Sequence, residues 1–388
     1  MNCTIIGGAG FIGTRTALKL VARGHSIRIL DALDPQIHGL DISASEMLAS
    51  VAGKIPVTVG DVRDPAAIRM ALDAADVVYY FAAGTGTGQS MYQVRKYTEI
   101  NVLGAAVLGE ELALRKGQIR RVVISSSRAV YGEGAYTCTQ HGRIFPRSRD
   151  PRALEEGEFT PLCPHCAGSL VETASLESDP VQPSSIYGIT KLAQEQIILN
   201  LCESLGIPAV ALRYQNVFGP GQSLKNPYTG ILSIFSQQLL QDKPINVFED
   251  GRPTRDFIYI DDIAEFNCRA GEKELHGSHI CNVGTGVRQT LLDVVDVLAQ
   301  TYGRKPDYRI SGQFRLGDIR HAAADTTHLR RVLGEHTFVS FSEGITRFAD
   351  WVRRQNIEQE SNARYARSLE EMASIGLLRG GSVERSKS

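Results

Sequence analysis

The sequence has no long apolar run and almost no net charge. None of its hydrophobic stretches approaches the ~18 residues that a membrane-spanning helix requires. Lys and Arg together number 42 and Asp and Glu number 43, which gives a formal charge of -1. This balance argues against a general nucleic-acid binder and against a protein of anionic membrane surfaces. A hydrophobic content of 43% excludes a chain that is disordered throughout.

The sequence also lacks a basic leader and has few cysteines. Residues 1–7 run directly into an apolar strand and a glycine turn, unlike a signal peptide, so we expect a cytoplasmic protein. Seven cysteines in 388 residues do not make a disulfide framework. In a reducing compartment, cysteines that cluster indicate metal binding first.

Short apolar runs alternate with helical patterns over residues 1–130, as they do in βαβ units. Strands are expected at 3–7, 26–31, 57–60, 76–81 and 120–126, and helices at 11–22 and 90–114. The order predicts an α/β fold, a Rossmann-type doubly wound parallel sheet with right-handed crossovers.

Changes in composition divide the chain into parts. Residues 1–215 are expected to form the sheet domain, interrupted at about 133–185 by an insertion rich in Pro, Gly, Arg, Glu and Cys. Residues 216–355 have shorter elements separated by Gly and Pro and predict a smaller α/β domain, with elements near 255–290 able to rejoin the sheet. Residues 356–388 are polar and predict a last helix followed by a flexible tail.

A glycine turn follows the first predicted strand and opens the first predicted helix. Gly7, Gly10 and Gly13 permit a tight turn, and the free N–H groups at the helix start favour a pyrophosphate. Asp31 ends the second strand, where a carboxylate accepts bonds from ribose hydroxyls and repels a 2′-phosphate. The pattern favours NAD over NADP, with Gly60-Asp61-Val62 placed to cover the adenine. The alternative is a structural turn that binds no phosphate.

A serine run and a Tyr-Lys pair form the candidate catalytic group. Ser125–Ser127 end the strand predicted at 120–126, and Tyr187 and Lys191 stand four residues apart on one helix face. A nearby ammonium, together with the positive nicotinamide of the cofactor, lowers the pKa of a phenol, which can then act as a base near neutral pH. A lone Tyr-Lys pair of this spacing also occurs on solvated helix faces, so its weight depends on the combination with the glycine turn.

In combination, these motifs resemble a known enzyme family. The matching stretches are GGAGFIG at 7–13, GDV at 60–62, FAAG at 81–84, SSSRAVYG at 125–132, YGITK at 187–191, RYQNVFGPGQ at 213–222, RDFIYIDD at 255–262 and NVGTG at 282–286. Over about residues 1–350, the chain resembles the extended short-chain dehydrogenase/reductases of the NAD-dependent nucleotide-sugar epimerase/dehydratase family. Stretches 33–39, 86–104, 130–136 and 226–235 are most similar to proteins described as dTDP-L-rhamnose 4-epimerases, which also carry a cysteine-bearing insertion.

The resemblance implies roles for individual residues. Tyr187 would be the base, Lys191 would bind the nicotinamide ribose, and Ser127 would bond the same substrate oxygen. The implied NAD site comprises Gly7, Gly10, Phe11, Ile12, Gly13, Asp31, Asp61, Val62, Phe81, Ala82, Ala83, Asn101, Tyr187 and Lys191. The implied nucleotide-diphosphate sugar site comprises Ser127, Arg128, Asn216, Arg255 and Arg315. Guanidinium groups suit phosphate oxygens, although Arg255 and Arg315 could instead form surface ion pairs.

The residues after Ser127 narrow the reaction. The adjacent Asp-Glu pair of a 4,6-dehydratase, the Glu of a decarboxylase and the Cys of a 3,5-epimerase are replaced by Arg128 and Ala129. The resemblance then implies a 4-epimerase that oxidises C4, turns the 4-keto sugar and re-reduces it, on a dTDP- or UDP-hexose such as dTDP-L-rhamnose. A 4-ketoreductase or dehydrogenase and a non-catalytic NAD-sensing protein stay open. The family also implies a homodimer through helices at about 90–114 and 186–203.

The insertion contains two pairs of potential metal ligands. Cys138 and His141 form one pair, and Cys163 and Cys166 form the other. Two such pairs in one polar segment indicate a closed, four-coordinate structural zinc site. His165 lies between the two later cysteines and is expected to point away. The alternatives are a redox CxxC and unligated cysteines. The insertion is expected to cap the sugar pocket or to contribute to a subunit interface.

Overall fold

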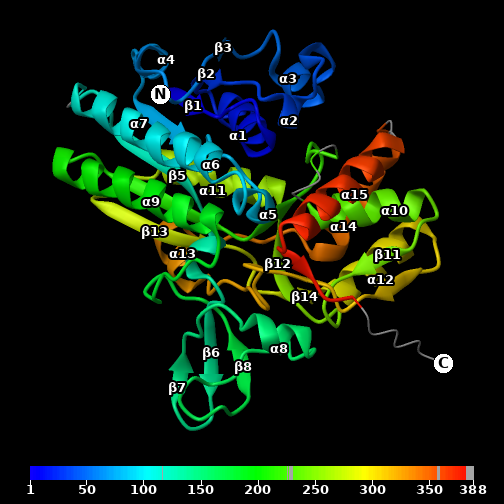
Figure 1. Ribbon diagram of the computed structural model, residues 1–388. Helices are drawn as coiled ribbons and strands as arrows, with labels where there is room; N and C mark the ends of the chain where they lie inside the picture. The colour runs from blue at the N-terminus through cyan, green and yellow to red at the C-terminus, as the bar shows by residue number, and fades with distance from the viewer. Residues whose placement is uncertain (116, 225, 227–229, 356–358, 382–388) are drawn as a thin grey trace.

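A seven-stranded parallel sheet forms the centre of the molecule (Figure 1). The computed structural model describes residues 1–115, 117–224, 226, 230–355 and 359–381. The strand order is β13-β9-β5-β4-β1-β2-β3, and every neighbouring pair is parallel. The strands are β1 Asn2–Ile6, β2 Ser26–Asp31, β3 Val57–Val59, β4 Val77–Tyr80, β5 Arg121–Ser127, β9 Ala209–Tyr214 and β13 Ser278–Val283. This is the doubly wound order that the alternating pattern predicts.

Helices cover both faces of the sheet, and each face has its own apolar core. One core holds α1 (Phe11–Ala22), α3 (Glu46–Val51), α11 (Ile260–Glu272) and α13 (Thr327–Leu333) against the sheet. The other holds α4 (Pro65–Ala71), α7 (Gly104–Ala113) and α9 (Ile186–Leu205). All seven residues of β5 are buried, as expected for a strand covered on both faces. The short elements α2 (Pro35–His38) and η1 (Ile42–Ala44) follow β2.

The long helix predicted at 90–114 is interrupted. The chain instead forms α5 (Thr87–Ser90), α6 (Val94–Tyr97), a π-helical segment η2 (Thr98–Leu103) and then α7. Apolar spacing does not distinguish these forms, because each of the segments α5, α6 and η2 is too short to show a period of its own. Segments of π-helix occur often at functional sites, and this one carries the predicted cofactor residue Asn101.

A smaller α/β unit packs beside the carboxyl edge of the sheet. It contains β10 (Asn216–Phe218), β12 (Thr254–Tyr259) and β14 (Arg288–Thr290) in one sheet, and β11 (Ile245–Val247) beside β15 (Tyr308–Ile310). The helices α10 (Ile231–Leu240), α12 (Leu291–Tyr302) and α14 (Phe341–Arg353) enclose its core. The chain crosses back into the large sheet at β13, so residues 278–283 belong with the first part of the chain.

The insertion folds as a separate small sheet that projects from the body of the molecule (Figure 1). After η3 (Arg128–Tyr131), strands β6 (Ala135–Cys138), β7 (Gly142–Ile144) and β8 (Leu170–Thr173) pair in the antiparallel order β7-β6-β8, with α8 (Pro151–Glu155) nearby. Its core is small and consists of Tyr136, Cys138, Ile144, Cys163 and Leu170. A core of this size suggests that a further crosslink stabilises the insertion.

The last helix expected from the sequence is α15 (Gln359–Ser374). After it, Leu378–Arg379 form β17, which pairs with β16 (Phe314–Arg315). This strand was not predicted: the flexible tail was expected to begin at once. None of the described helices combines the length and apolar character of a membrane span.

Candidate active site

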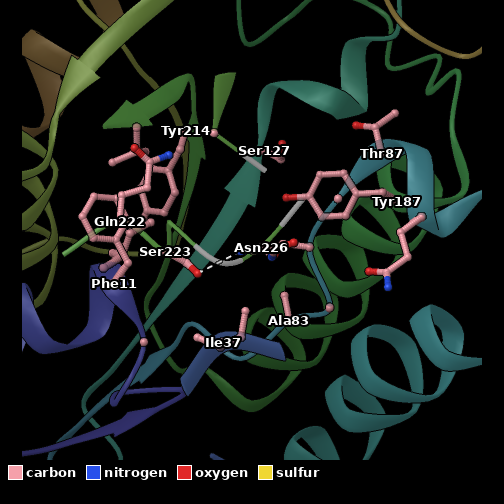
Figure 2. Close-up of a pocket in the computed structure, with 18 of the residues that line it drawn as sticks. Phe11, Ile37, Ala83, Thr87, Ser127, Tyr187, Tyr214, Gln222, Ser223 and Asn226 are labelled. Atoms are coloured by element: carbon pink, nitrogen blue, oxygen red, sulfur yellow. Dashed lines mark hydrogen bonds between the residues drawn. The ribbon is translucent and has the colours of Figure 1, made fainter. Parts of the chain in front are cut away.

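A cavity of about 790 Å³ lies at the carboxyl ends of the strands, where doubly wound sheets bind ligands. Its walls come from the glycine turn, the end of β5, the start of α9 and the smaller α/β unit. In Figure 2, the Tyr187 phenol enters this cavity with Ser127 near its hydroxyl end and Ala83 beneath it. The cavity therefore brings residues from both parts of the chain to one place.

Other backbone atoms approach the glycine turn so closely that a side chain at Gly7 or Gly13 would collide with them. A Cβ at Gly7, which has φ of +79°, would lie 2.4 Å from the backbone nitrogen of Ala82. A Cβ at Gly13 would lie 2.6 Å from the Cα of Gly8. Gly10 begins α1 without a side-chain cap, and Gly10, Phe11 and Ile12 line the cavity. The N–H groups of this helix start are thus available to a pyrophosphate, which fits a dinucleotide.

Asp31 lies beside the glycine turn, where the ribose of a dinucleotide would bind. One carboxylate oxygen accepts a 2.9 Å hydrogen bond from the Ala9 N–H and the other accepts a 2.9 Å bond from the Leu33 N–H. Each oxygen retains a lone pair for a further donor, such as a ribose hydroxyl. Asp61 and Val62 line the same end of the cavity, and the bidentate partner Arg63 lowers the pKa of Asp61.

Asn101 supports the wall of the predicted cofactor site. This fully buried side chain accepts a 2.7 Å bond from the Gly84 N–H and donates a 2.9 Å bond to the Thr190 hydroxyl. It therefore joins the loop after β4, which carries Phe81, Ala82 and Ala83 at the cavity wall, to helix α9.

The three predicted catalytic residues lie together. Ser127 ends β5, while Tyr187 and Lys191 occupy the first two turns of α9, which Ser185 caps by accepting from the Gly188 N–H. The Tyr187 N–H also donates a 3.0 Å bond to the Ser90 hydroxyl. The side chains of Tyr187 and Ser127 both line the cavity, and Ser127 lies near enough to the Tyr187 phenol to oppose the rise of its pKa.

The sequence argument lowers the pKa of the Tyr187 phenol through the Lys191 ammonium together with the positive nicotinamide of the cofactor. Among the protein's own groups, burial raises the pKa of Tyr187, and the opposing effects come from Ser127 and the charge of Arg128. Because the phenol is deeply buried, desolvation of the phenolate outweighs them.

Lys191 is buried between α9 and β5. Its ammonium donates a 2.5 Å bond to the carbonyl oxygen of Ser125 and a further bond to the side-chain oxygen of Gln194. Burial lowers the pKa of Lys191 to about 7, against the opposing charge of Glu195. Gln194 in turn donates a 3.1 Å bond to the Ala82 carbonyl.

The sequence argument missed Ser90, Thr190 and Gln194 as supports of this site. Thr190 and Gln194 lie three residues after Tyr187 and Lys191 respectively, so helical spacing alone could have indicated that they share the catalytic face.

The predicted substrate-binding residues also line the cavity. They are Arg128 and the three predicted diphosphate residues Asn216, Arg255 and Arg315. Arg255 donates to the carbonyls of Thr254, Ile319 and Arg320, at 2.7 to 3.1 Å. Arg315 pairs with Asp318 at 2.8 Å and stacks over Phe248. Burial lowers the pKa of Arg128 to about 9, and the charge of Arg255 adds to that effect. Three guanidinium groups around one cavity suit a doubly charged anion.

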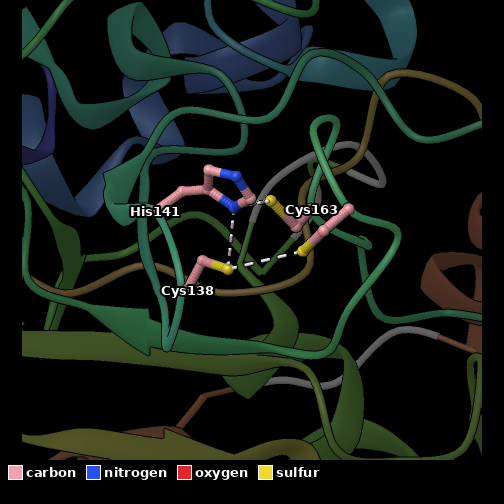
Figure 3. A group of neighbouring side chains, drawn as sticks. Cys138, His141 and Cys163 are labelled. Atoms are coloured by element: carbon pink, nitrogen blue, oxygen red, sulfur yellow. Dashed lines mark hydrogen bonds between the residues drawn. The ribbon is translucent and has the colours of Figure 1, made fainter.

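The four predicted metal ligands meet in the insertion (Figure 3). Cys138 Sγ lies 3.7 Å from Cys166 Sγ and 3.5 Å from His141 Nδ1, and Cys163 Sγ lies 3.6 Å from the same nitrogen. Tetrahedral zinc with bonds of ~2.3 Å to sulfur and ~2.0 Å to nitrogen places sulfurs about 3.8 Å apart and sulfur about 3.6 Å from nitrogen. The donor set therefore fits zinc. All seven cysteines are free of disulfides, and His165 is outside the four-residue group.

The fold and site together define a dinucleotide-dependent enzyme of the Tyr-Lys type. The model of the NAD dependent epimerase/dehydratase family matches residues 3–151 and 163–284, with its gap inside the insertion. The chain belongs to this family.

Named relatives agree with this membership. A dTDP-L-rhamnose 4-epimerase of Burkholderia thailandensis is 33% identical over 90% of this chain and 94% of its own length. A UDP-glucose 4-epimerase of Mycolicibacterium smegmatis is 28% identical over 92% of this chain and all of its own. The structure of a Thermus thermophilus UDP-glucose 4-epimerase in complex with NAD has a TM-score of 0.71 and 25% identity, over 92% of this chain and 100% of that one.

Proposed function

We propose that the protein is an NAD-retaining 4-epimerase of nucleotide-diphosphate sugars, with a dTDP- or UDP-hexose such as dTDP-L-rhamnose as substrate. One observation carries the proposal: Ser127, Tyr187 and Lys191 line one cavity, while Arg128 and Ala129 supply no second acid-base pair. Elimination or decarboxylation needs such a group, and C4 epimerisation does not. The 33% identity with a dTDP-L-rhamnose 4-epimerase supports this reaction and this sugar.

The residues would work as follows. Tyr187 takes the proton of the sugar 4-hydroxyl, and Ser127 donates a hydrogen bond to the same oxygen. NAD, when bound, would supply the hydride acceptor for C4 and the hydride donor for the opposite face of C4. The 4-keto sugar would turn over within the cavity between these steps, and Tyr187 would return the proton to the same oxygen. Lys191 would hold the nicotinamide ribose, and Asp31 would hold the adenosine ribose.

The substrate's diphosphate would occupy the arginine-lined wall. Arg255 is fixed by three backbone carbonyls and Arg315 by Asp318 and Phe248, so both guanidinium groups are oriented before substrate binds. Preorganised cations lose little side-chain entropy on binding. Anchoring by the diphosphate leaves the sugar free to turn between two orientations.

The cluster Cys138, His141, Cys163 and Cys166 would hold one structural zinc ion, because four protein ligands leave no open position for catalysis. The protein would also form a homodimer through α9 and the segment 90–114, which holds α6, η2 and α7; these helices pack against α9, and α6, η2 and α9 carry exposed apolar residues such as Ile189. The cytoplasmic location expected from the sequence stays a prediction.

Conversion of dTDP-L-rhamnose by protein purified without added cofactor tests the proposal. We expect NAD to be released on denaturation, the C4 proton signal of a new epimer to appear by NMR, and NADH absorbance to stay constant. Bound NAD without conversion would exclude this sugar and call for UDP-hexoses, uronates and heptose nucleotides. Steady production or consumption of NADH would replace the epimerase with a dehydrogenase or 4-ketoreductase. A Tyr187→Phe protein that kept full function would favour the NAD-sensing alternative.

A further inference from the structure

The C-terminal segment closes one wall of the cavity. We call residues 359–381 the strap; it comprises α15, β17 and their connection. The strap lies beyond the family match, which ends at residue 284. Figure 1 shows α15 lying along α10 of the smaller unit. Tyr365, on α15, lines the cavity together with Arg315 and Asp318.

The strap is attached to the strand that carries Arg315. Within β16 and β17, Arg315 is paired with Leu378 and Phe314 with Arg379. The Leu316 N–H donates a 2.9 Å bond to the Leu377 carbonyl, which continues this pairing. Among the described strands, β17 is the hydrogen-bonded neighbour of β16. The backbone position of Arg315 therefore depends on the strap.

The strap also reaches the NAD-binding part and the insertion. Met372 is buried, and its sulfur would lie 2.9 Å from a Cβ at Gly88, so the two residues are in close contact. The Tyr92 hydroxyl donates a 3.1 Å bond to Glu371, and Arg379 pairs with Glu155 of α8 at 3.2 Å. One segment thus contacts the NAD-binding part, the smaller unit and the insertion.

Tyr365 lines the cavity and can therefore contact a ligand bound there. Burial raises the pKa of its phenol while the charge of Arg315 opposes that rise, so the two groups lie within electrostatic reach. A protonated phenol beside a guanidinium group offers a neutral donor next to a cation, an arrangement suited to a phosphate oxygen. Phe248, over which Arg315 stacks, forms the adjoining surface of the same wall.

We propose that Tyr365 is a substrate-contacting residue whose hydroxyl donates a hydrogen bond to the diphosphate of the nucleotide sugar, and that the strap completes the diphosphate site. The inference rests on the proposed function only in that the cavity takes a nucleoside diphosphate group. It adds a binding residue from a part of the chain that the family match does not cover. A tyrosine that served only to pack α15 would leave ligand affinity unchanged when its hydroxyl is removed.

Binding of dTDP and UDP to the NAD-loaded protein, measured by calorimetry, tests this contact without turnover. Tyr365→Phe should weaken the affinity for the better of the two ligands about 10-fold, because a hydrogen bond to a charged group is lost. Tyr308→Phe, at an exposed tyrosine of β15, is the matched control and should bind as the unaltered protein does. Equal affinities for the Tyr365→Phe variant and the unaltered protein would overturn the proposal.

A second variant tests the role of the strap apart from that of the Tyr365 hydroxyl. Met372→Ala keeps Tyr365 but removes the contact with Gly88, and should also weaken nucleoside diphosphate binding. In an epimerase assay, both variants should raise KM by about the factor found in Kd. They should also keep kcat within about 3-fold, since the reacting atoms are untouched. Undiminished binding by Met372→Ala would refute the role of the strap. Failure of the unaltered protein to bind either dTDP or UDP would instead contradict the proposed function.

Discussion

The Nε of Arg128 donates a 2.9 Å hydrogen bond to Oδ1 of Asn216, which joins the residues that follow the neighbouring strands β5 and β9. The bond holds the guanidinium group of Arg128 near the catalytic phenol. The positive charge of Arg128 acts to lower the pKa of Tyr187. Arg128 directly follows Ser127, and a guanidinium group does not serve as a general acid or base near neutral pH. In this site it can only stabilise negative charge, on the phenolate or on the substrate.

Replacement of Arg128 by methionine should therefore change the pH dependence of the reaction. Loss of the nearby cation raises the pKa of Tyr187, so the rate should begin to rise only at higher pH. At pH 7 we expect kcat to fall roughly 10-fold, with partial recovery in alkaline buffer. The pH profile of kcat measures this. Asn216→Ala frees the guanidinium group of Arg128 without removing it, and should therefore shift the pH profile of kcat less than Arg128→Met does. A profile of unchanged shape in Arg128→Met would contradict the electrostatic role.

Lys191 should make stability depend on pH above neutrality. Its pKa is about 7 in the folded protein, below the usual lysine value, so the unfolded chain binds more protons between that pKa and the unfolded one. The cost of burying the ammonium is fully present below pH 7 and is relieved as the pH rises toward 10. In Lys191→Met this contribution is absent. The variant should thus gain stability relative to the parent at pH 6.5, on the order of a few kcal/mol, and lose that advantage by pH 9.5.

Urea unfolding of both proteins at equal NAD content, at these two pH values, measures the difference. Lys54→Met, at an exposed lysine, serves as the control and should show no such pH-dependent difference. A constant difference between the parent and Lys191→Met across the range would show that the ammonium stays charged when buried.

Short sequence patterns predict those features of the site that depend only on residues close together in the chain. The glycine turn, Asp31 and the ends of β1, β2 and β5 follow from short apolar runs and the residues next to them. Tyr187 and Lys191 are four residues apart on a helix, so their common face needs no tertiary information. The same holds for the cysteine pairs, whose spacing within each pair is short.

What the sequence does not predict depends on long-range contacts. The pairing of Arg315 with Leu378 joins two short strands far apart in the chain, and neither strand has a pattern of its own. The π-helical segment at Thr98–Leu103 leaves the apolar pattern of a long helix in place. The raised pKa of Tyr187 reflects its burial, which depends on packing from several elements.

Loss of a ligand in the insertion should remove zinc and little else. His141→Ala should carry less than about a tenth of the zinc of the parent, because three ligands bind a structural ion much more weakly than four. His165→Ala is the matched control: its ring lies 5.1 Å from that of His141, but it is outside the ligand group, and it should keep one zinc per chain. Metal analysis by mass spectrometry, together with the NAD content of the same samples, measures both. Equal zinc in the two variants would refute the assignment of ligands.

The exposed apolar residues on α6, η2 and α9 should hold two subunits together. Val94, Leu103 and Ile189 are 44%, 47% and 49% exposed, and these helices pack side by side in the subunit. A second copy placed against them would bury this surface in a four-helix bundle. Ile189→Asp introduces two charges into that bundle, one from each copy, and should convert a dimer into a monomer by light scattering.

Val171→Asp is the matched control, because Val171 is 65% exposed on β8 of the insertion, away from these helices. It should leave the dimer intact. If Val171→Asp dissociated the dimer while Ile189→Asp did not, the subunit interface would lie on the insertion, the other position that the sequence allows.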